Sequence, residues 1–156
     1  MTENFPKGFV LSDQLVYGMR SPGLFEIKIH NPTKRNAIAS IPELKLTELI
    51  NAAQDNEAIK VILLHGGRFF SSGNDLSAFA DSFKISGDIS GYLAKAEVGV
   101  NVTMVDMLLA MNKSIKPIVA VVRGGAIGIG FTMLSHAHFI YTSPEAIFKT
   151  PFMESG

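Results

Sequence analysis

Two glycine-rich segments of this sequence could do chemistry with their backbone alone. The first, FFSSGNDL, comes soon after the apolar run KVILLH, and the second, GGAIGIG, follows the apolar run KPIVAVV. Glycine lets a backbone approach a ligand closely, and the N–H groups at the start of a helix have no partner within that helix. The end of a buried strand that leads into a helix is therefore a suitable place for a ligand.

The residues directly after two of these glycines are the candidate catalytic groups. Asn74 follows Gly73, and Ile129 follows Gly128. If their backbone N–H groups point at one position, they form an oxyanion hole, a pair of preorganised donors for a developing enolate. A helix beginning near Gly128 would add the positive end of its dipole there. The alternative, on spacing alone, is that the glycines serve only tight turns from strand to helix.

Alternating strands and helices are predicted around these segments. Leu24 to His30 alternates apolar and polar residues, as a half-exposed strand does, and Pro42 to Asp55 carries apolar residues on one helical face. The short apolar runs at 60–65 and 116–122 predict strands covered on both faces, and 123–130 predicts a turn. The remaining predictions are helices at 76–83, 92–112 and 131–138, and strands at 139–143 and 146–149. This order predicts an α/β fold in a single domain over residues 1–156.

Composition and motifs argue against several other classes. The 14 basic and 14 acidic side chains cancel, so overall charge gives no case for nucleic acid or for an anionic membrane. The absence of cysteine excludes a disulfide scaffold, and His136 and His138 have no third ligand at a suitable spacing, so we expect no metal. No apolar run is long enough to span a membrane, and GAIGIG lacks the glycine spacing of a dinucleotide fingerprint.

The motifs together resemble the crotonase (enoyl-CoA hydratase/isomerase) superfamily. FFSSGNDLSAF, KPIVAVVRGGAIGIGFTML and AIFKTPF occur in the family's order, and the resemblance runs from about Leu24 to the last residue. Within the family, the Ser-Ser-Gly-Asn-Asp-Leu and Thr-Pro-Phe strings are most similar to peroxisomal-type Δ3,Δ2-enoyl-CoA isomerases. The resemblance implies a crotonase-like spiral of ββα turns, with the N–H groups of Asn74 and Ile129 as the oxyanion donors.

The resemblance also implies where an acyl-CoA thioester would lie. Residues 31–38 match the family's loop beside the CoA moiety, where Lys34 and Arg35 could meet a CoA phosphate, although a solvated basic loop is the alternative. Asp75 matches a typically acidic position, and we expect its carboxylate to cap the following helix and fix the Asn74 amide. The residues expected to bind substrate are Lys34, Arg35, Asn36, Ala37, Ser71, Ser72, Gly73, Asp75, Leu76 and Gly128. No cofactor is implied, because CoA is part of the substrate.

The general base is not identified within the sequence. Hydratases of the family use two glutamates, and the matching positions here are Thr132 and Phe152, which cannot take a proton, so hydratase chemistry is not expected. Similar isomerases place one glutamate beyond the Thr-Pro-Phe segment, which here falls a few residues past Gly156. Glu154 comes too early to match it.

The resemblance therefore predicts an isomerase that shifts a 3-enoyl-CoA double bond to give 2-trans-enoyl-CoA in unsaturated fatty acid oxidation. Because the family fold continues into a helical region that covers the site and makes trimer contacts, we expect the 156 residues to be the N-terminal part of a longer chain, inactive alone. The full-length form is expected to be a homotrimer or hexamer in the peroxisome, or alternatively in the mitochondrion. The alternative function is a non-catalytic acyl-CoA-binding or protein-interaction module, since crotonase-like domains without the base also occur.

Overall fold

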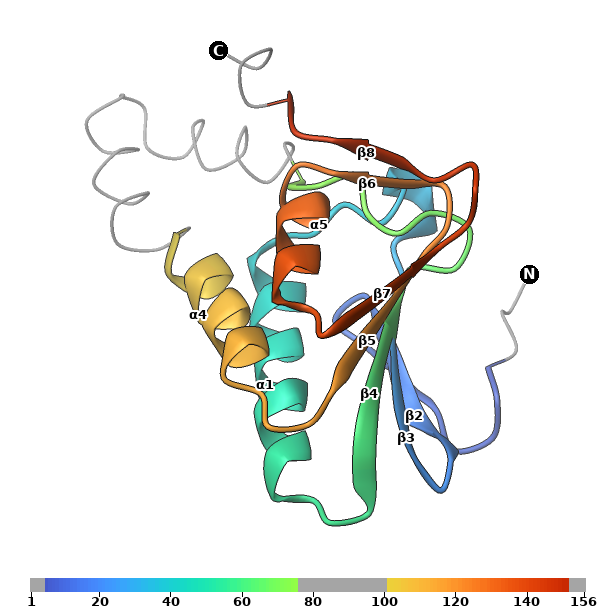
Figure 1. Ribbon diagram of the computed structural model, residues 1–156, viewed down its shortest axis with the longest axis vertical. Helices are drawn as coiled ribbons and strands as arrows, with labels where there is room; N and C mark the ends of the chain where they lie inside the picture. The colour runs from blue at the N-terminus through green and yellow to red at the C-terminus, as the bar shows by residue number, and fades with distance from the viewer. Residues whose placement is uncertain (1–4, 76–100, 152–156) are drawn as a thin grey trace.

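Helices cover one face of a mixed six-stranded sheet (Figure 1). The structure is a computed structural model that describes residues 5–75 and 101–151. The strands of the large sheet lie in the order β1-β2-β3-β4-β5-β7, and β6 and β8 form a second, two-stranded sheet. The elements are β1 (Val10–Ser12), β2 (Leu15–Ser21), β3 (Gly23–Ile29), η1 (Pro32–Lys34), α1 (Ser40–Asp55), β4 (Ile59–His65), α4 (Asn101–Asn112), β5 (Ile118–Val122), β6 (Gly125–Ile127), α5 (Ile129–Thr132), η3 (Met133–His136), β7 (Phe139–Thr142) and β8 (Ile147–Lys149).

The pairing of the strands divides the large sheet into two parts. β1, β2 and β3 pair antiparallel, whereas β3, β4, β5 and β7 pair parallel. Parallel neighbours need a crossover, and α1 supplies it between β3 and β4. The predicted strands and the helix at 42–55 are confirmed, as is the described part of the helix at 92–112. The segment predicted as a helix at 131–138 forms the end of α5 and the 3-10 helix η3, and the segment 76–83 and residues 92–100 lie outside the described residues.

The core lies between the sheet and the helices α1 and α4. Ile27, Ile62 and Ile118 project from neighbouring strands and are at most 1% exposed. They belong to one buried cluster with Leu46 and Ile50 of α1 and with methionines of α4. The helical spacing of the apolar residues in α1 is therefore explained by this one-sided burial. Not every strand residue is covered, because Lys60 in β4 is exposed, so the expectation that β4 is buried on both faces holds only in part.

Two elements differ from the sequence prediction. The hairpin of β1 and β2 was not predicted, because its turn uses positive φ at Asp13 (53°) and Gln14 (63°) without the glycine that usually marks such a turn. The segment predicted as a turn at 123–130 contains strand β6. Gly125 is in that strand, and a Cβ there would collide with the ring of Phe69. Glycine at this position makes room for an aromatic side chain and does not mark a turn.

The strands near the end of the described chain are largely exposed. All four residues of β7 and all three of β8 are exposed, including the aromatic residues Phe139, Tyr141 and Phe148. In the part of the chain that the structure describes, no helix is long and apolar enough to cross a membrane.

Candidate active site

The two glycine-rich segments meet in the structure. The first segment runs beside β6, where the N–H of Ser71 donates to the carbonyl of Gly125 at 3.1 Å and the N–H of Ile127 donates to the carbonyl of Ser71 at 2.9 Å. Further along, a Cβ built on Gly128 would lie 3.9 Å from the Cα of Gly73. The residues predicted to carry the oxyanion donors, Asn74 and Ile129, each follow one of these two glycines.

A third segment fixes the direction of the backbone N–H of Asn74. The N–H of Ile38 donates to the carbonyl of Gly73 at 2.8 Å, and the N–H of Asp75 donates to the carbonyl of Ile38 at 2.9 Å. The carbonyl of Gly73 and the N–H of Asn74 belong to one planar trans peptide and point in opposite directions. The N–H of Asn74 is therefore directed away from Ile38.

The second predicted donor, the N–H of Ile129, lies at the start of α5. Gly128 precedes this helix, and its carbonyl accepts hydrogen bonds from the N–H groups of Phe131 and Thr132 at 3.0 Å. α5 begins at Ile129, two residues before the predicted helix at 131–138, and it continues as the 3-10 helix η3 after four residues. Within residues 5–75 and 101–151, neither the N–H of Asn74 nor that of Ile129 donates a hydrogen bond. Both amides are therefore available to a ligand as far as these residues are concerned.

Several of the predicted substrate-binding residues are buried or bonded to other groups of the protein. Asn36, Ala37 and Ser71 are buried, at 5%, 7% and 0% exposure, and the polar groups of Asn36 and Ser71 bond within the protein. Ser72 donates its hydroxyl to the carbonyl of Lys34 at 2.9 Å. Leu76 lies outside the described residues. The structure thus brings residues 34–38 and 71–75 together, and binding of substrate by these residues stays a prediction.

The carboxylate of Asp75 lies beside a cation. Lys34 Nζ is 2.7 Å from Asp75 Oδ2, and the Lys34 side chain is 46% exposed while that of Asp75 is 11% exposed. The helix that Asp75 was expected to cap falls on residues outside the described part of the chain, so that role stays a prediction. Lys34 remains accessible enough to face a ligand as well as Asp75.

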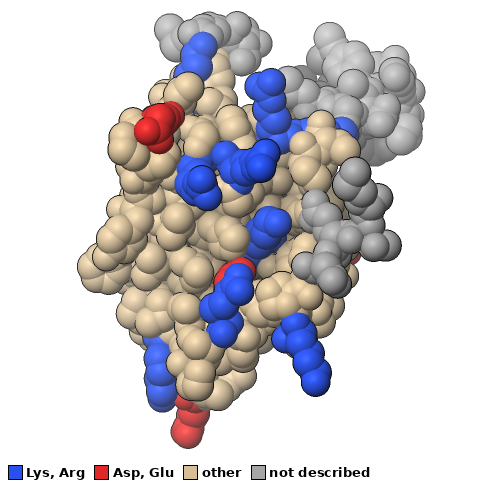
Figure 2. Space-filling model, turned by 90° about the vertical axis from the view of Figure 1, so that its right-hand side faces the viewer, with Lys and Arg blue, Asp and Glu red and all other residues tan. Residues whose placement is uncertain are grey.

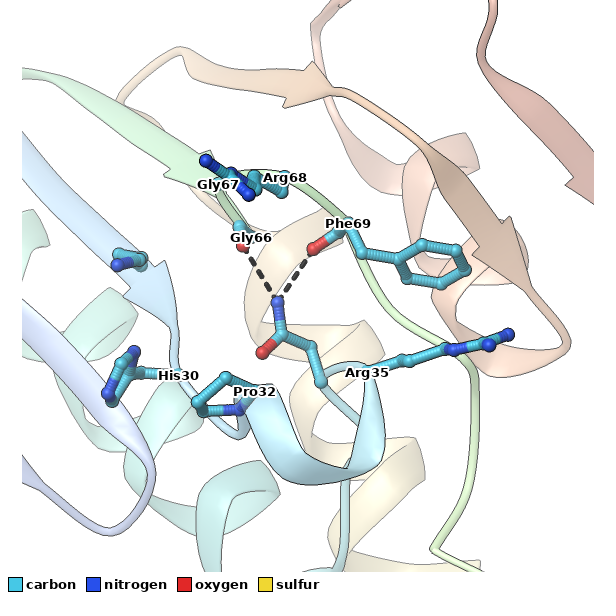
Figure 3. Close-up of a pocket in the computed structure, with 9 residues that line it drawn as sticks. His30, Pro32, Arg35, Gly66, Gly67, Arg68 and Phe69 are labelled. Atoms are coloured by element: carbon cyan, nitrogen blue, oxygen red, sulfur yellow. Dashed lines mark hydrogen bonds between the residues drawn. The ribbon is translucent and has the colours of Figure 1, made fainter.

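Basic side chains gather beside this loop. A hollow of about 400 Å³ is lined by Lys28, His30, Pro32, Arg35, Asn36, Gly66, Gly67, Arg68 and Phe69 (Figure 3). Figure 2 shows Lys and Arg side chains spread over the side of the molecule that faces away from α1 and α4, with few acidic ones among them. Arg68 was missed in the sequence, although it follows a Gly-Gly pair directly. The hollow has the charge to suit an anionic ligand.

A charged cluster lies beside the hollow, in a second hollow that shares Lys28 and Gly67 with the first. Glu26 is 4% exposed, and it accepts hydrogen bonds from the Arg20 guanidinium, one of them at 2.8 Å. His65 Nε2 lies 3.2 Å from the same carboxylate. Burial alone would raise the pKa of Glu26, but the hydrogen bonds and charges of Arg20 and His65 outweigh it and hold that pKa below its usual range. The carboxylate therefore stays ionised.

Comparison with known proteins identifies the family. The family model described as enoyl-CoA hydratase/isomerase matches residues 19–156. The chain belongs to this family.

Individual relatives are named as isomerases and hydratases. Over 134 residues the chain is 32% identical to enoyl-CoA delta isomerase 2 of Homo sapiens, covering 86% of this chain and 32% of that protein. It is 29% identical over 132 residues to the peroxisomal enoyl-CoA delta isomerase 3 of Mus musculus, covering 85% of this chain and 39% of the relative. The crystal structure of an enoyl-CoA hydratase/isomerase from Pseudoalteromonas atlantica superposes with a TM-score of 0.74 at 28% identity, over 92% of this chain and 51% of that one. The chain therefore spans about a third to a half of the length of these relatives.

These matches confirm the predicted crotonase-like fold. The resemblance implied that Thr132 matches one of the two positions that carry glutamate in hydratases of the family, and that match stays a prediction. The Thr132 hydroxyl donates to the carbonyl of Gly128 at 3.2 Å, within α5. The other such position, Phe152, and Glu154 lie outside the described residues. Across the described ranges, no group of three or more His, Cys, Asp or Glu side chains could hold a metal ion.

Proposed function

We propose that this chain carries the oxyanion hole of an enzyme that converts 3-enoyl-CoA to 2-trans-enoyl-CoA. The observation that carries the proposal is the meeting of Gly73 and Gly128, which brings the loops of Asn74 and Ile129 together. Both N–H groups lack a partner within the described residues. Two such donors at one thioester oxygen are the arrangement that stabilises an enolate.

The reaction moves one proton and shifts one double bond. A base removes a proton from C2, and the electron pair of that C–H bond delocalises over the C3=C4 double bond and the thioester carbonyl. Negative charge builds on the carbonyl oxygen, where the N–H groups of Asn74 and Ile129 donate to it. The same base then returns the proton at C4, which leaves a double bond between C2 and C3. Because the oxygen carries more negative charge in the transition state and in the dienolate than in the bound substrate, these donors lower the barrier more than they strengthen substrate binding.

Isomerisation is preferred to hydration because of the residues available for proton transfer. Hydration requires a base that activates water and an acid that protonates carbon, and Thr132 cannot act as either at neutral pH. We place the single base of the isomerase in the part of the full-length protein that follows Gly156. The relatives named as delta isomerases support the choice of isomerisation over hydration, and one of them carries a peroxisomal name. We extend that location to this protein as part of the proposal.

The binding part of the proposal assigns the basic hollow to the CoA phosphates. Arg35 and Arg68 line it, and Lys34 lies on the same loop as Arg35. Guanidinium groups bind phosphate oxygens with paired hydrogen bonds. Residues 31–38 would then contact CoA on one side and hold the Gly73–Asn74 peptide on the other.

The test is a product analysis with the full-length protein. 3-trans-Hexenoyl-CoA is supplied, and formation of the conjugated 2-enoyl thioester is followed by its ultraviolet absorbance, with chromatography to detect 3-hydroxyacyl-CoA. We expect the conjugated isomer and no hydration product. Rapid formation of 3-hydroxyacyl-CoA from 2-enoyl-CoA would make the protein a hydratase. Binding of acyl-CoA without any turnover would make it a non-catalytic module.

A further inference from the structure

Three segments of the candidate site make contact at Ser71. Its backbone pairs with Ala126 of β6. Its hydroxyl donates to the carbonyl of Asn36 at 2.8 Å and accepts from the N–H of Gly73 at 3.1 Å. Its side chain also lies against α5, because a Cβ built on Gly130 would be only 2.7 Å from the Cβ of Ser71. Ser71 therefore touches the loop before α1, the Gly73 loop and the residue after Ile129.

Ser71 cannot contact a ligand with its hydroxyl. The residue is 0% exposed, and both the donor and one acceptor site of the hydroxyl are used by protein groups. Any effect of Ser71 on a reaction must pass through the groups that it holds. Those groups include the N–H of Gly73, one peptide before the Asn74 amide.

Asn36 anchors the other side of the same arrangement. Its side-chain Nδ2 donates to the carbonyls of Gly66 at 2.8 Å and Phe69 at 2.6 Å, the two dashed lines in Figure 3. Its Oδ1 accepts from the N–H of Asn31 at 2.8 Å. The buried amide therefore joins the turn after β4 to the loop 31–38.

The conformation of Asn36 also suits its place. Its φ is +58°, a left-handed conformation that asparagine tolerates better than most residues. The backbone carbonyl of the same residue receives the Ser71 hydroxyl. Through these hydrogen bonds, Asn36 and Ser71 link the turn after β4 to the N–H of Gly73.

Gly73 needs this support because glycine has little conformational preference of its own. The peptide before it is held by Ser71 Oγ, and the peptide after it by the N–H of Ile38. With both peptides held, the direction of the Asn74 N–H is fixed before any ligand binds. Preorganised donors avoid the reorganisation that would otherwise add to the barrier.

We propose that Asn36 and Ser71 are positioning residues that hold the Asn74 N–H in register with the Ile129 N–H, and that neither contacts substrate. The inference rests on the proposed function. Substitution of either residue should therefore slow the chemical step and have little effect on substrate binding, because the proposed CoA contacts are made by Arg35 and Arg68. A merely structural role would instead lower the amount of folded protein without changing the turnover of each folded molecule.

The test compares Ser71→Ala with the unsubstituted full-length protein in the conversion of 3-hexenoyl-CoA. We expect kcat per folded molecule to fall by about tenfold with KM nearly unchanged, since a small misplacement of one donor weakens transition-state binding selectively. The carbonyl stretching frequency of bound 2-hexenoyl-CoA, read by infrared difference spectroscopy, should move back toward its value in water. Ser135→Ala removes an exposed hydroxyl that bonds to the Thr132 carbonyl, and it serves as the control with unchanged kcat.

A second pair of variants keeps the test decisive if Ser71→Ala does not fold. Asn36→Gly preserves the left-handed conformation but removes the amide, and Asn36→Asp keeps the shape but points an acceptor at two carbonyls. Both should lower kcat in the folded fraction, Asn36→Asp more than Asn36→Gly. If Ser71→Ala folds, unchanged kcat and carbonyl frequency in this variant would overturn the positioning role but not the proposed function. If Ser71→Ala does not fold, the same result in both Asn36 variants would overturn it. Absence of turnover in the unsubstituted protein would overturn the proposed function itself.

Discussion

Gly73 and Gly128 face each other across the two loops, and a side chain lacks space at only one of them. A Cβ on Gly73 would lie 2.9 Å from the carbonyl oxygen of Ile127, which is closer than atoms can approach without displacement. A Cβ on Gly128 would lie 3.9 Å from the Cα of Gly73, which is an ordinary contact. Gly73 is therefore required both for space and for its φ of +94°, and Gly128 is required for its backbone conformation alone.

Gly73→Ala should separate the two loops. The new methyl group pushes against the Ile127 carbonyl, and the φ of +94° is unfavourable for alanine. We expect kcat for 3-hexenoyl-CoA to fall by about 100-fold, the effect of losing one oxyanion donor. Gly8→Ala is the matched control, because Gly8 has a φ of +88° with nothing within 4 Å of the added Cβ. Equal kcat in both variants would remove the assignment of the hole.

Gly128 variants should separate backbone strain from the loss of a hydrogen bond. Its φ of 55° and ψ of −125° are open almost only to glycine, so Gly128→Ala should cost about 1 to 3 kcal/mol and turn the Ile129 N–H. Gly128→Pro also removes the N–H that donates to the Lys149 carbonyl at 2.9 Å. We expect reduced turnover in the alanine variant and none in the proline variant, measured with melting temperatures. Turnover unaltered in either protein would contradict the placement of Ile129.

The sequence predicted the regular elements well where burial of one face produces a periodic pattern of apolar residues. The alternation in β3 and the one-sided spacing in α1 follow directly from contact with the core, so both were predicted within a few residues. The hairpin of β1 and β2 carries no such pattern, because Leu15 and Val16 are both buried although they are neighbours in the strand. Its turn at Asp13 and Gln14 has the conformation but not the residues of a typical hairpin turn.

The candidate site was predicted in outline but not in its internal contacts. Gly73 and Gly128 stand out in the sequence because glycine signals a close approach. Nothing in the sequence shows that the Ser71 hydroxyl bridges to Asn36, since serine and asparagine are also common at ligand-binding surfaces. That both are buried and bonded internally follows from the pairing of segments far apart in the chain, which only the fold reveals.

Arg35 and Arg68 should control binding and not turnover. We expect Arg35→Gln and Arg68→Gln each to raise KM for 3-hexenoyl-CoA several-fold with kcat retained, because a lost phosphate contact weakens substrate and transition state alike. The dependence of KM on ionic strength should become shallower. Lys113→Gln removes an exposed charge at the end of α4 and is the control variant.

The same prediction can be checked from the side of the substrate. The pantetheine thioester of 3-hexenoate lacks the nucleotide phosphates, so its KM should be the same in Arg68→Gln as in the unsubstituted protein. An equal rise of KM for the CoA and pantetheine esters would show that Arg68 acts on the acyl or pantetheine part. The hollow would then not be the phosphate site.

His65 makes the turn after β4 sensitive to acid. Its Nδ1 accepts a hydrogen bond from the N–H of Gly67 at 3.2 Å, so the neutral ring carries its proton on Nε2, toward Glu26. Burial lowers the pKa of His65; the Glu26 carboxylate opposes this shift, and Lys28 and Arg20 add to it. Protonation would place a hydrogen on Nδ1 and remove the acceptor of the Gly67 N–H.

Stability should therefore fall as the pH decreases. The folded pKa of His65 lies below the value of about 6.5 in the unfolded chain, so the unfolded state binds the proton first. The contribution of neutral His65 is complete above about pH 6.5 and is lost as the pH falls through the folded pKa. The lowered pKa of Glu26 continues the loss at more acidic pH with the same sign. His65→Gln should flatten the dependence of the melting temperature on pH below about pH 6.5. An unchanged slope in this variant would assign the acid sensitivity to another group.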